Sequence, residues 1–308
     1  MTTIEVERRR AQLLTGAALV VVYLVWGSTY FVMRVAMKML DPFLMCGLRF
    51  VTAGALLLVF LRLRGTPLPN ARQWLASAIV GALLLVFGNG FVAIAERTVD
   101  SGVAATVVAT VPLWAAGIAM VWGERATRLE LLGLALGFCG VLILHRGGSL
   151  GARGRELDTL AIVIAPIAWA TGSVWSRRLP LPKGLMASAA QMLTGGVMLL
   201  FCSVLHGESL PARLEVSGVA SFLYLVVFGS LIAFSAYGFL LRTASPAVAT
   251  SYAYANPVVA LAIGALFNGE GFTSHKALAC ALTVAGVAVV LAGRARSRPV
   301  ATAASAVK

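Results

Sequence analysis

Residues 74–95 read WLASAIVGALLLVFGNGFVAIA and contain no charged residue in 22 positions. A helix needs about 20 predominantly apolar residues to cross a hydrocarbon core roughly 30 Å thick. Further stretches without any charge are 11–33, 101–123, 184–205, 216–241 and 243–269. Four others are shorter or interrupted: 131–144, 159–176, 277–293, and 42–61 with its single Arg49.

Ten apolar stretches joined by short loops predict an all-α membrane protein with ten transmembrane helices. A chain segment surrounded by lipid must close its own backbone hydrogen bonds, which a helix does. The composition agrees, because 59% of the residues are hydrophobic and only 12% are charged, against about 45–50% and 25% in soluble domains. The surface is therefore expected to face a lipid bilayer, and no soluble domain is expected.

The formal net charge is +13, which raises the question of nucleic-acid binding. The Lys and Arg residues lie at the ends of the apolar stretches and in the tails, without interleaved aromatic residues, so no nucleic-acid partner is expected. With the N-terminus inside, 16 Lys and Arg residues fall on the cytoplasmic side and 8 outside. This positive-inside bias predicts that both termini are cytoplasmic.

The two halves of the chain resemble each other at a slowly drifting offset. Trp26 and Arg34 match Trp169 and Arg177 at 143 residues, Pro112 matches Pro257 at 145, and Gly123-Glu124 matches Gly269-Glu270 at 146. A five-span repeat is odd-numbered, so the second copy is expected to be inverted, as in many secondary transporters. The predicted segments are an N-terminal tail (1–13), two five-helix repeats (14–145 and 158–293), a connecting loop (146–157) and a basic tail (294–308).

Several motifs resemble those of one transporter family. WGSTYF at 26–31, SPAVA at 245–249, Asn256-Pro257 and Gly269-Glu270 resemble the pattern of the EamA family of the drug/metabolite transporter superfamily, over roughly residues 14–293. The stretches Gly88-Asn89-Gly90 with Ala95-Glu96, and SYAYANP at 251–257, are most similar to its YedA-type exporters. The resemblance implies a ten-helix exporter of metabolites or drugs in a bacterial inner membrane, without identifying the solute.

Two prolines lie near the middle of matching stretches, Pro112 in the fourth and Pro257 in the ninth. A proline inside a helix removes one hydrogen bond and kinks the helix. The freed carbonyl group is tolerated at membrane depth only where it is buried in protein or faces a wet cavity. The pair predicts a shared central site with a role in gating, although a packing kink without any ligand is the alternative.

Polar and aromatic residues cluster around these breaks. Tyr252 and Asn256 are four residues apart and share a helix face, and Asn89 lies between two glycines, where a helix bends easily. Hydrogen bonding between helices explains any one such residue equally well, but the set predicts an amphipathic cavity for amino acids, organic amines or drug-like solutes. The predicted substrate-binding residues are Trp26, Thr29, Tyr30, Asn89, Trp169, Gln191, Tyr252, Tyr254 and Asn256.

Arg49 and Glu96 are the two charges whose positions are hardest to explain. Arg49 is seven residues into the second stretch, and a charge at such depth normally faces the protein interior or water. Glu96 ends the third stretch on the same side, so the two are predicted to pair. The pair is either a static link between two helices or a gate in which Glu96 carries a proton.

No motif for catalysis or metal binding is found. The four cysteines are isolated, without CxxC spacing, and no P-loop lysine motif is present. No metal, cofactor or enzymatic activity is therefore expected, and the function predicted is secondary transport by alternating access. The alternatives are an intramembrane enzyme and a sensory membrane protein. A GxxxG motif at 133–137 fits either a homo-oligomer interface or internal packing.

Overall fold

A computed structural model describes residues 3–97, 107–124, 126–144, 156–211, 213–268 and 274–297. Within these ranges every regular element is helical. Most of the predicted connecting loop 146–157, the end of the basic tail, and Gly269-Glu270 lie outside them.

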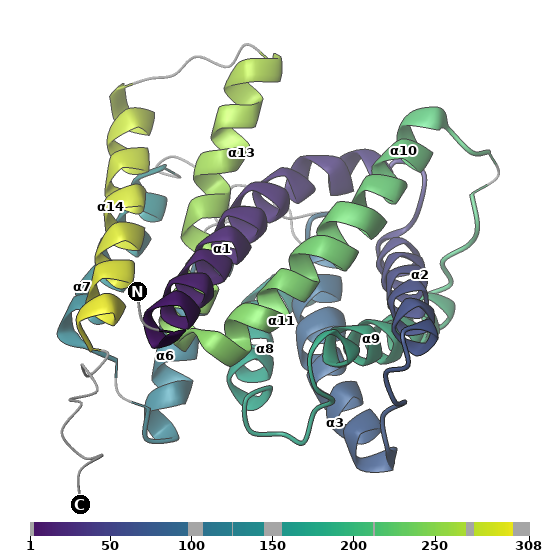
Figure 1. The fold of residues 1–308 in the computed structure, drawn as a ribbon. Helices are drawn as coiled ribbons and strands as arrows, with labels where there is room; N and C mark the ends of the chain where they lie inside the picture. Colours follow the sequence, from purple (N-terminus) through teal and green to yellow (C-terminus); the bar gives the residue numbers. More distant parts are fainter. Residues whose placement is uncertain are drawn as a thin grey trace, which may run out of the picture.

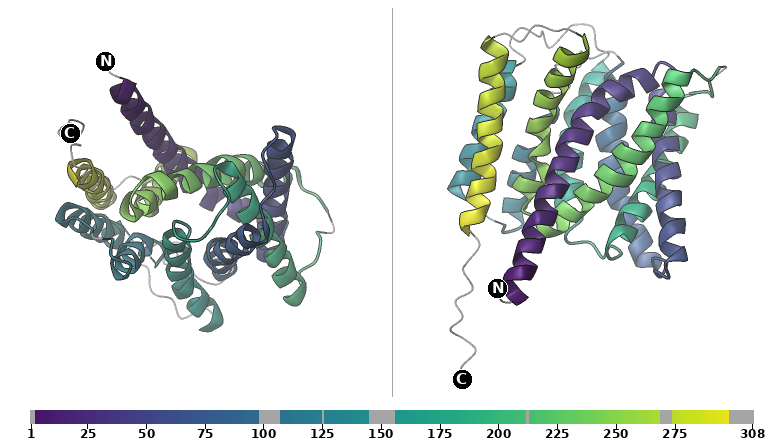
Figure 2. Two further views of the ribbon diagram at one scale, coloured as in Figure 1. Left: turned by 60° about the horizontal axis from the view of Figure 1, so that its bottom comes forward. Right: turned by 45° about the horizontal axis from the view of Figure 1, so that its top comes forward.

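The helices follow the apolar stretches closely. The elements of the first half are α1 (Thr3–Ala36), α2 (Pro42–Leu63), α3 (Ala71–Gly81), η1 (Ala82–Gly90), α4 (Phe91–Ala95), α6 (Val111–Val121) and α7 (Arg128–Leu144). Those of the second half are α8 (Glu156–Trp175), α9 (Leu185–Leu205), α10 (Val216–Tyr224), η2 (Leu225–Ile232), α11 (Ala233–Thr243), α12 (Pro246–Thr250), α13 (Tyr252–Asn268) and α14 (Ser274–Ser297). Figures 1 and 2 show them as one bundle.

Six helical segments of the described residues are long and apolar enough to cross a membrane. They are Arg9–Ala36, Pro42–Leu63, Ala71–Ala95, Leu157–Trp175, Leu185–Leu205 and Val216–Thr243. Val111–Val121 and Ala277–Gly293 are shorter apolar helices. Many large apolar side chains on these helices are exposed, as a surface in contact with lipid requires. The chain is an all-helical membrane protein.

Equivalent helices of the two halves pack against each other in opposite directions. In α2, Gly47 lies against Leu200 of α9, and Gly54 lies against Leu193. The two helices are therefore antiparallel. Inverted copies require this relation, and α7 and α14 repeat it, with Gly133 against Val290 and Gly140 against Thr283. The first residues of α1 and the last residues of α14 lie on the same side of the bundle (Figure 2, right).

The third apolar stretch of each half contains a π-helical segment. The segment η2 starts at residue 225, which is 143 positions after the start of η1 at residue 82. It ends at residue 232, which is 142 positions after the end of η1 at residue 90. This offset agrees with the sequence repeat. Such segments are rare and frequently mark functional sites. The predicted bend at Asn89 is therefore a stretch of widened helix, and it has a counterpart around Gly229 and Ser230.

The two predicted proline kinks differ in the structure. Pro257 lies inside α13, and a separate turn at Ser251 divides α12 from α13. Pro112 is in the first turn of α6, where a proline costs no intrahelical hydrogen bond. The prediction of a mid-helix kink at Pro112 is wrong, because the helix restarts there after a turn at residues 109–110.

The GxxxG motif is used inside the chain. Gly133 and Gly137 both lie against Gly286 of α14. Their small size allows the backbones of α7 and α14 to approach closely, which is the internal-packing alternative.

Candidate functional site

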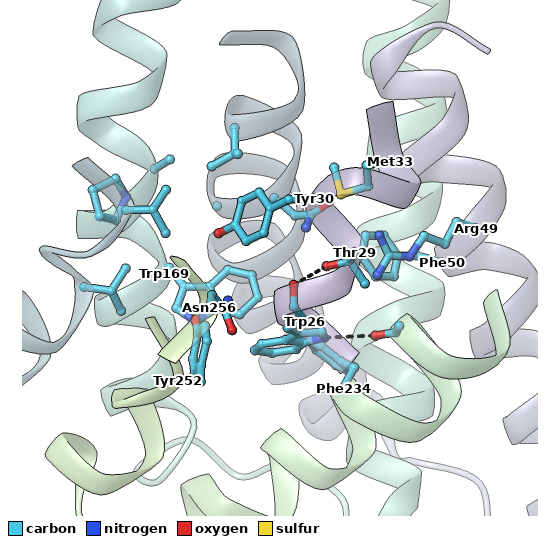
Figure 3. A pocket seen from close by; sticks show the side chains of 18 residues that line it. Trp26, Thr29, Tyr30, Met33, Arg49, Phe50, Trp169, Phe234, Tyr252 and Asn256 are labelled. Carbon is cyan, nitrogen blue, oxygen red and sulfur yellow. Dashed lines mark hydrogen bonds between the residues drawn. The ribbon is translucent and has the colours of Figure 1, made fainter. Parts of the chain in front are cut away.

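A cavity lies between the two halves of the bundle (Figure 3). Its volume is about 70 Å³, well below the roughly 300–1,000 Å³ of a typical ligand pocket, so the lining side chains must move apart to admit a solute. The residues that line it are Trp26, Thr29, Tyr30, Met33, Arg49, Phe50, Gly88, Asn89, Val92, Val108, Val111, Ala165, Pro166, Trp169, Gly229, Phe234, Tyr252 and Asn256.

Four aromatic rings form a layer at one end of the cavity. Trp26 is at its centre, with ring centroids 5.5 Å from Trp169, 5.0 Å from Tyr237 and 4.7 Å from Tyr252. Trp26 also donates a hydrogen bond from Nε1 to the carbonyl oxygen of Gly229 (3.1 Å). We call these four residues the aromatic layer. In Figure 3, Trp26 and Tyr252 lie at the opposite end of the cavity from Met33.

The aromatic layer is also held by hydrogen bonds within the second half. Trp169 Nε1 donates to the hydroxyl oxygen of Tyr237 (3.1 Å), and that hydroxyl group is hydrogen bonded to Ser173 Oγ (2.6 Å). All four residues are buried. Because Tyr252 starts α13 and Trp169 lies near the end of α8, the layer separates the cavity from the side of the bundle where α1 begins.

Within the part of the chain that the structure describes, Arg49 is the only charged residue that lines the cavity. Its Nε donates a hydrogen bond to Ser230 Oγ (2.7 Å) in η2. The guanidinium carbon also lies 4.7 Å from the centre of the Phe50 ring. Arg49 Nη1 is buried and has no hydrogen-bond partner.

Two amide side chains face the cavity from opposite halves of the chain. Asn89 Oδ1 accepts a hydrogen bond from Cys46 Sγ (3.2 Å). Asn256 is 2% exposed, and its Oδ1 has no hydrogen-bond partner. A buried polar atom without a partner carries a free-energy cost, so the Asn256 oxygen is available to a donor group of a ligand.

The structure brings together seven of the nine predicted substrate-binding residues. Trp26, Thr29, Tyr30, Asn89, Trp169, Tyr252 and Asn256 all line the cavity. Gln191 does not, because α9 packs there against Gly81 of α3. Tyr254 does not either, because its ring lies against Gly137 of α7, on another face of α13.

The residues predicted to act in gating or coupling do not form one group. Arg49 lines the cavity, whereas Glu96, Pro112 and Pro257 do not. Arg49 pairs with Ser230 and not with Glu96, whose Oε1 is buried without a hydrogen-bond partner. The predicted contact between the two charges is absent, because Arg49 turns toward the second half of the chain.

Sequence reasoning missed several lining residues. Pro166 lies inside α8, near the middle of its apolar stretch. A proline at such a position predicts a helix kink near a central site, as it does for Pro257. Gly229 could have been found as the counterpart of Gly88 at an offset of about 141 residues. Met33, Phe50 and Phe234 carry no comparable signal, since apolar residues are common in every span.

Comparison with known proteins assigns the chain to a family. The model of the EamA-like transporter family matches twice, over residues 14–146 and 158–292. An uncharacterised inner membrane transporter of Escherichia coli K12, YedA, is 45% identical over 278 residues, which cover 90% of each chain. A probable amino-acid metabolite efflux pump of Salmonella typhimurium is 24% identical over 90% of this chain and 95% of its own.

A solved crystal structure has the same fold. It superposes with a TM-score of 0.73 at 22% identity and covers 94% of this chain and 98% of its own.

Proposed function

The chain belongs to the EamA-like transporter family and is a membrane transporter; from this membership we propose that it exports small metabolites across the bacterial inner membrane by alternating access. The observation that carries the proposal is the cavity between the two halves. It combines aromatic rings with a few unsatisfied polar atoms, which is the composition of a small-molecule site. Export is favoured over uptake by the efflux pump among its relatives.

Alternating access requires that the cavity be closed on one side at a time. The aromatic layer lies between the cavity and the side where α1 begins, and we infer that it closes that side. At that same end, Glu124 after α6 pairs with Arg177 (2.7 Å) and Arg178 (3.5 Å) after α8. These contacts join the first half to the second, so they break if the halves separate there. We infer a transport cycle in which the inverted halves rock against each other around the cavity.

The Asn256 amide provides the test of the site. Asn256→Leu keeps the approximate volume, removes the unpartnered oxygen, and is expected to leave the amount of protein in the membrane unchanged. Loss of one hydrogen bond to the solute should weaken transport by a factor of about 5–30. The measurement is the resistance of expressing cells to a panel of toxic amino-acid analogues, organic acids and cationic dyes.

Tyr254→Phe is the matched control in the same helix. It removes the hydroxyl group of Tyr254, which has no hydrogen-bond partner and lies away from the cavity, so resistance should stay at the wild-type level. If Asn256→Leu retains wild-type resistance against every compound that the wild-type protein exports, the cavity is not the transport site.

The proposed topology has ten transmembrane helices and both termini in the cytoplasm. Leu68, between α2 and α3, and Ser209, between α9 and α10, are both exposed and should lie on opposite sides of the membrane. Single cysteines at these positions, in a background without the four native cysteines, are expected to react with an impermeant maleimide from inside and from outside, respectively. Reaction of both from the same side would contradict the topology.

A further inference from the structure

The positive charge of Arg49 is buried without an anionic partner among the described residues. The residue is 2% exposed, and no carboxylate of the described residues lies within 4.0 Å of its nitrogen atoms. One nitrogen, Nε, is satisfied by a neutral hydroxyl group, and Nη1 is unsatisfied. An unpaired charge in a membrane protein is costly and normally marks a functional site.

The surrounding residues hold the guanidinium group at the cavity wall. A Cβ at position 229 would lie 2.8 Å from Arg49 Nη2, so the absence of a side chain at Gly229 leaves room for the guanidinium group. Its neighbour Ser230 accepts the hydrogen bond from Nε, and Phe50 lies against the guanidinium carbon. The π-helical segment η2 thus provides both the space and the hydrogen bond that position the charge, yet it provides no negative charge.

We propose that Arg49 binds the carboxylate of the transported solute, and that the solutes are small organic monoanions with an apolar body. This inference rests on the proposed transport function. Among the described residues, the lining contains one cation and no acidic residue, so a single negative charge balances the site, whereas a cationic drug adds to the unpaired charge. A guanidinium group forms strong, directed hydrogen bonds with carboxylates.

The chemistry of the other lining residues suits such a solute. The aromatic rings of Trp26 and Trp169 offer apolar surface for its body. In Figure 3, Arg49 lies apart from Asn256. An elongated solute can therefore place its carboxylate on Arg49 and a hydrogen-bond donor near the free oxygen of Asn256, once the lining side chains have moved apart.

The test compares acids, amides and amines that share one carbon skeleton. The aromatic probes are hydrocinnamate, hydrocinnamamide and phenylpropylamine, and the aliphatic probes are isocaproate, isocaproamide and isohexylamine. Binding to the purified full-length protein in nanodiscs is measured by the change in tryptophan fluorescence and by calorimetry. At neutral pH the wild-type protein should bind at least one acid about 10-fold or more tightly than its amide, and the amine most weakly.

Arg49→Met should abolish the preference for the acid, and Arg49→Lys should keep part of it, since the charge remains but the planar group is lost. Removal of an uncompensated buried charge should leave the melting temperature of the unliganded protein unchanged or higher. A purely structural arginine would instead lower it. Arg97→Met, which removes an exposed charge near Asp41, is the control and should bind like the wild type.

Equal binding of acid and amide, or acid binding that survives Arg49→Met, would overturn the proposal. So would the absence of acid binding in both skeletons. If the wild type prefers the amines and Asn256→Leu weakens them, the carboxylate assignment fails while the transport proposal stands. Failure of transport itself is detected separately, by the resistance assay on Asn256→Leu.

Discussion

Replacing Gly286 with alanine should lower the amount of folded protein in the membrane several-fold. A Cβ at Gly286 would clash with the backbone nitrogen of Gly137 and would lie 2.6 Å from its Cα and 2.7 Å from the carbonyl oxygen of Gly133. These are backbone atoms of α7, and they cannot turn aside as a side chain can. Overpacking of a core commonly costs about 1–3 kcal/mol, and rigid neighbours place this substitution at the upper end.

The measurement is the fluorescence of a tagged protein in the membrane fraction, together with its melting temperature in detergent. Gly117→Ala is the matched control, because Gly117 also lies in a helix but has no atom within 4 Å of its Cβ position. Alanine there should be neutral or slightly stabilising, since it favours the helix. Equal amounts of the two variants in the membrane would show that α7 and α14 can move apart without loss of folded protein.

The positions of the helices could be predicted from the sequence because lipid leaves so few choices. The predicted stretch 42–61 and the observed α2 (Pro42–Leu63) begin at the same residue. The charge-free runs at 184–205 and 216–241 likewise correspond to helical segments with nearly the same ends. A charged residue is costly in the hydrocarbon core, so charges mark the ends of the helices directly.

The faces of the helices were harder to predict. Residues on a helix turn by about 100° each, so Tyr252 and Asn256 lie close together while Tyr254 points about 200° away from Tyr252. Their spacing correctly predicted the shared face of the first two. Nothing in the spacing indicates that Tyr254 packs on Gly137 of α7, because that depends on which helix lies beside α13.

The partner of Arg49 could not be predicted for the same reason. The sequence predicts Glu96 as the partner, because Glu96 belongs to the adjacent stretch and to the same side of the membrane. The structure places η2 of the second half beside Arg49 instead. This contact joins residues 181 positions apart, and a repeat offset near 143 gives no direct indication of it.

Replacing Trp26 with alanine should open the cavity to the side that the aromatic layer closes. Its ring contacts the three other rings of the layer, and each such pair contributes about 0.5–1.5 kcal/mol. The hydrogen bond from its Nε1 to Gly229 adds about 1 kcal/mol. A total of several kcal/mol corresponds to a change of at least about 10-fold in the balance between the closed and open forms.

A reporter cysteine makes this opening measurable. Val92 lines the cavity, and Val92→Cys in the cysteine-free background is expected to react with an impermeant thiol reagent from the periplasmic side only. With Trp26→Ala, the same cysteine should also react from the cytoplasmic side, in inverted vesicles, at a rate raised by about 10-fold or more. Net export should fall in parallel, since a cavity open to the cytoplasm cannot complete the cycle.

Two further variants separate closure from general damage. Trp26→Phe keeps an aromatic ring but loses the hydrogen bond to Gly229, so its labelling from the cytoplasmic side should be intermediate. Trp114→Ala removes a tryptophan that is 45% exposed in α6 and does not line the cavity, so its labelling pattern should match the wild type. If Trp26→Ala leaves Val92→Cys protected from the cytoplasmic side, the aromatic layer is a packing feature and closure depends on other contacts, such as the ion pairs of Glu124.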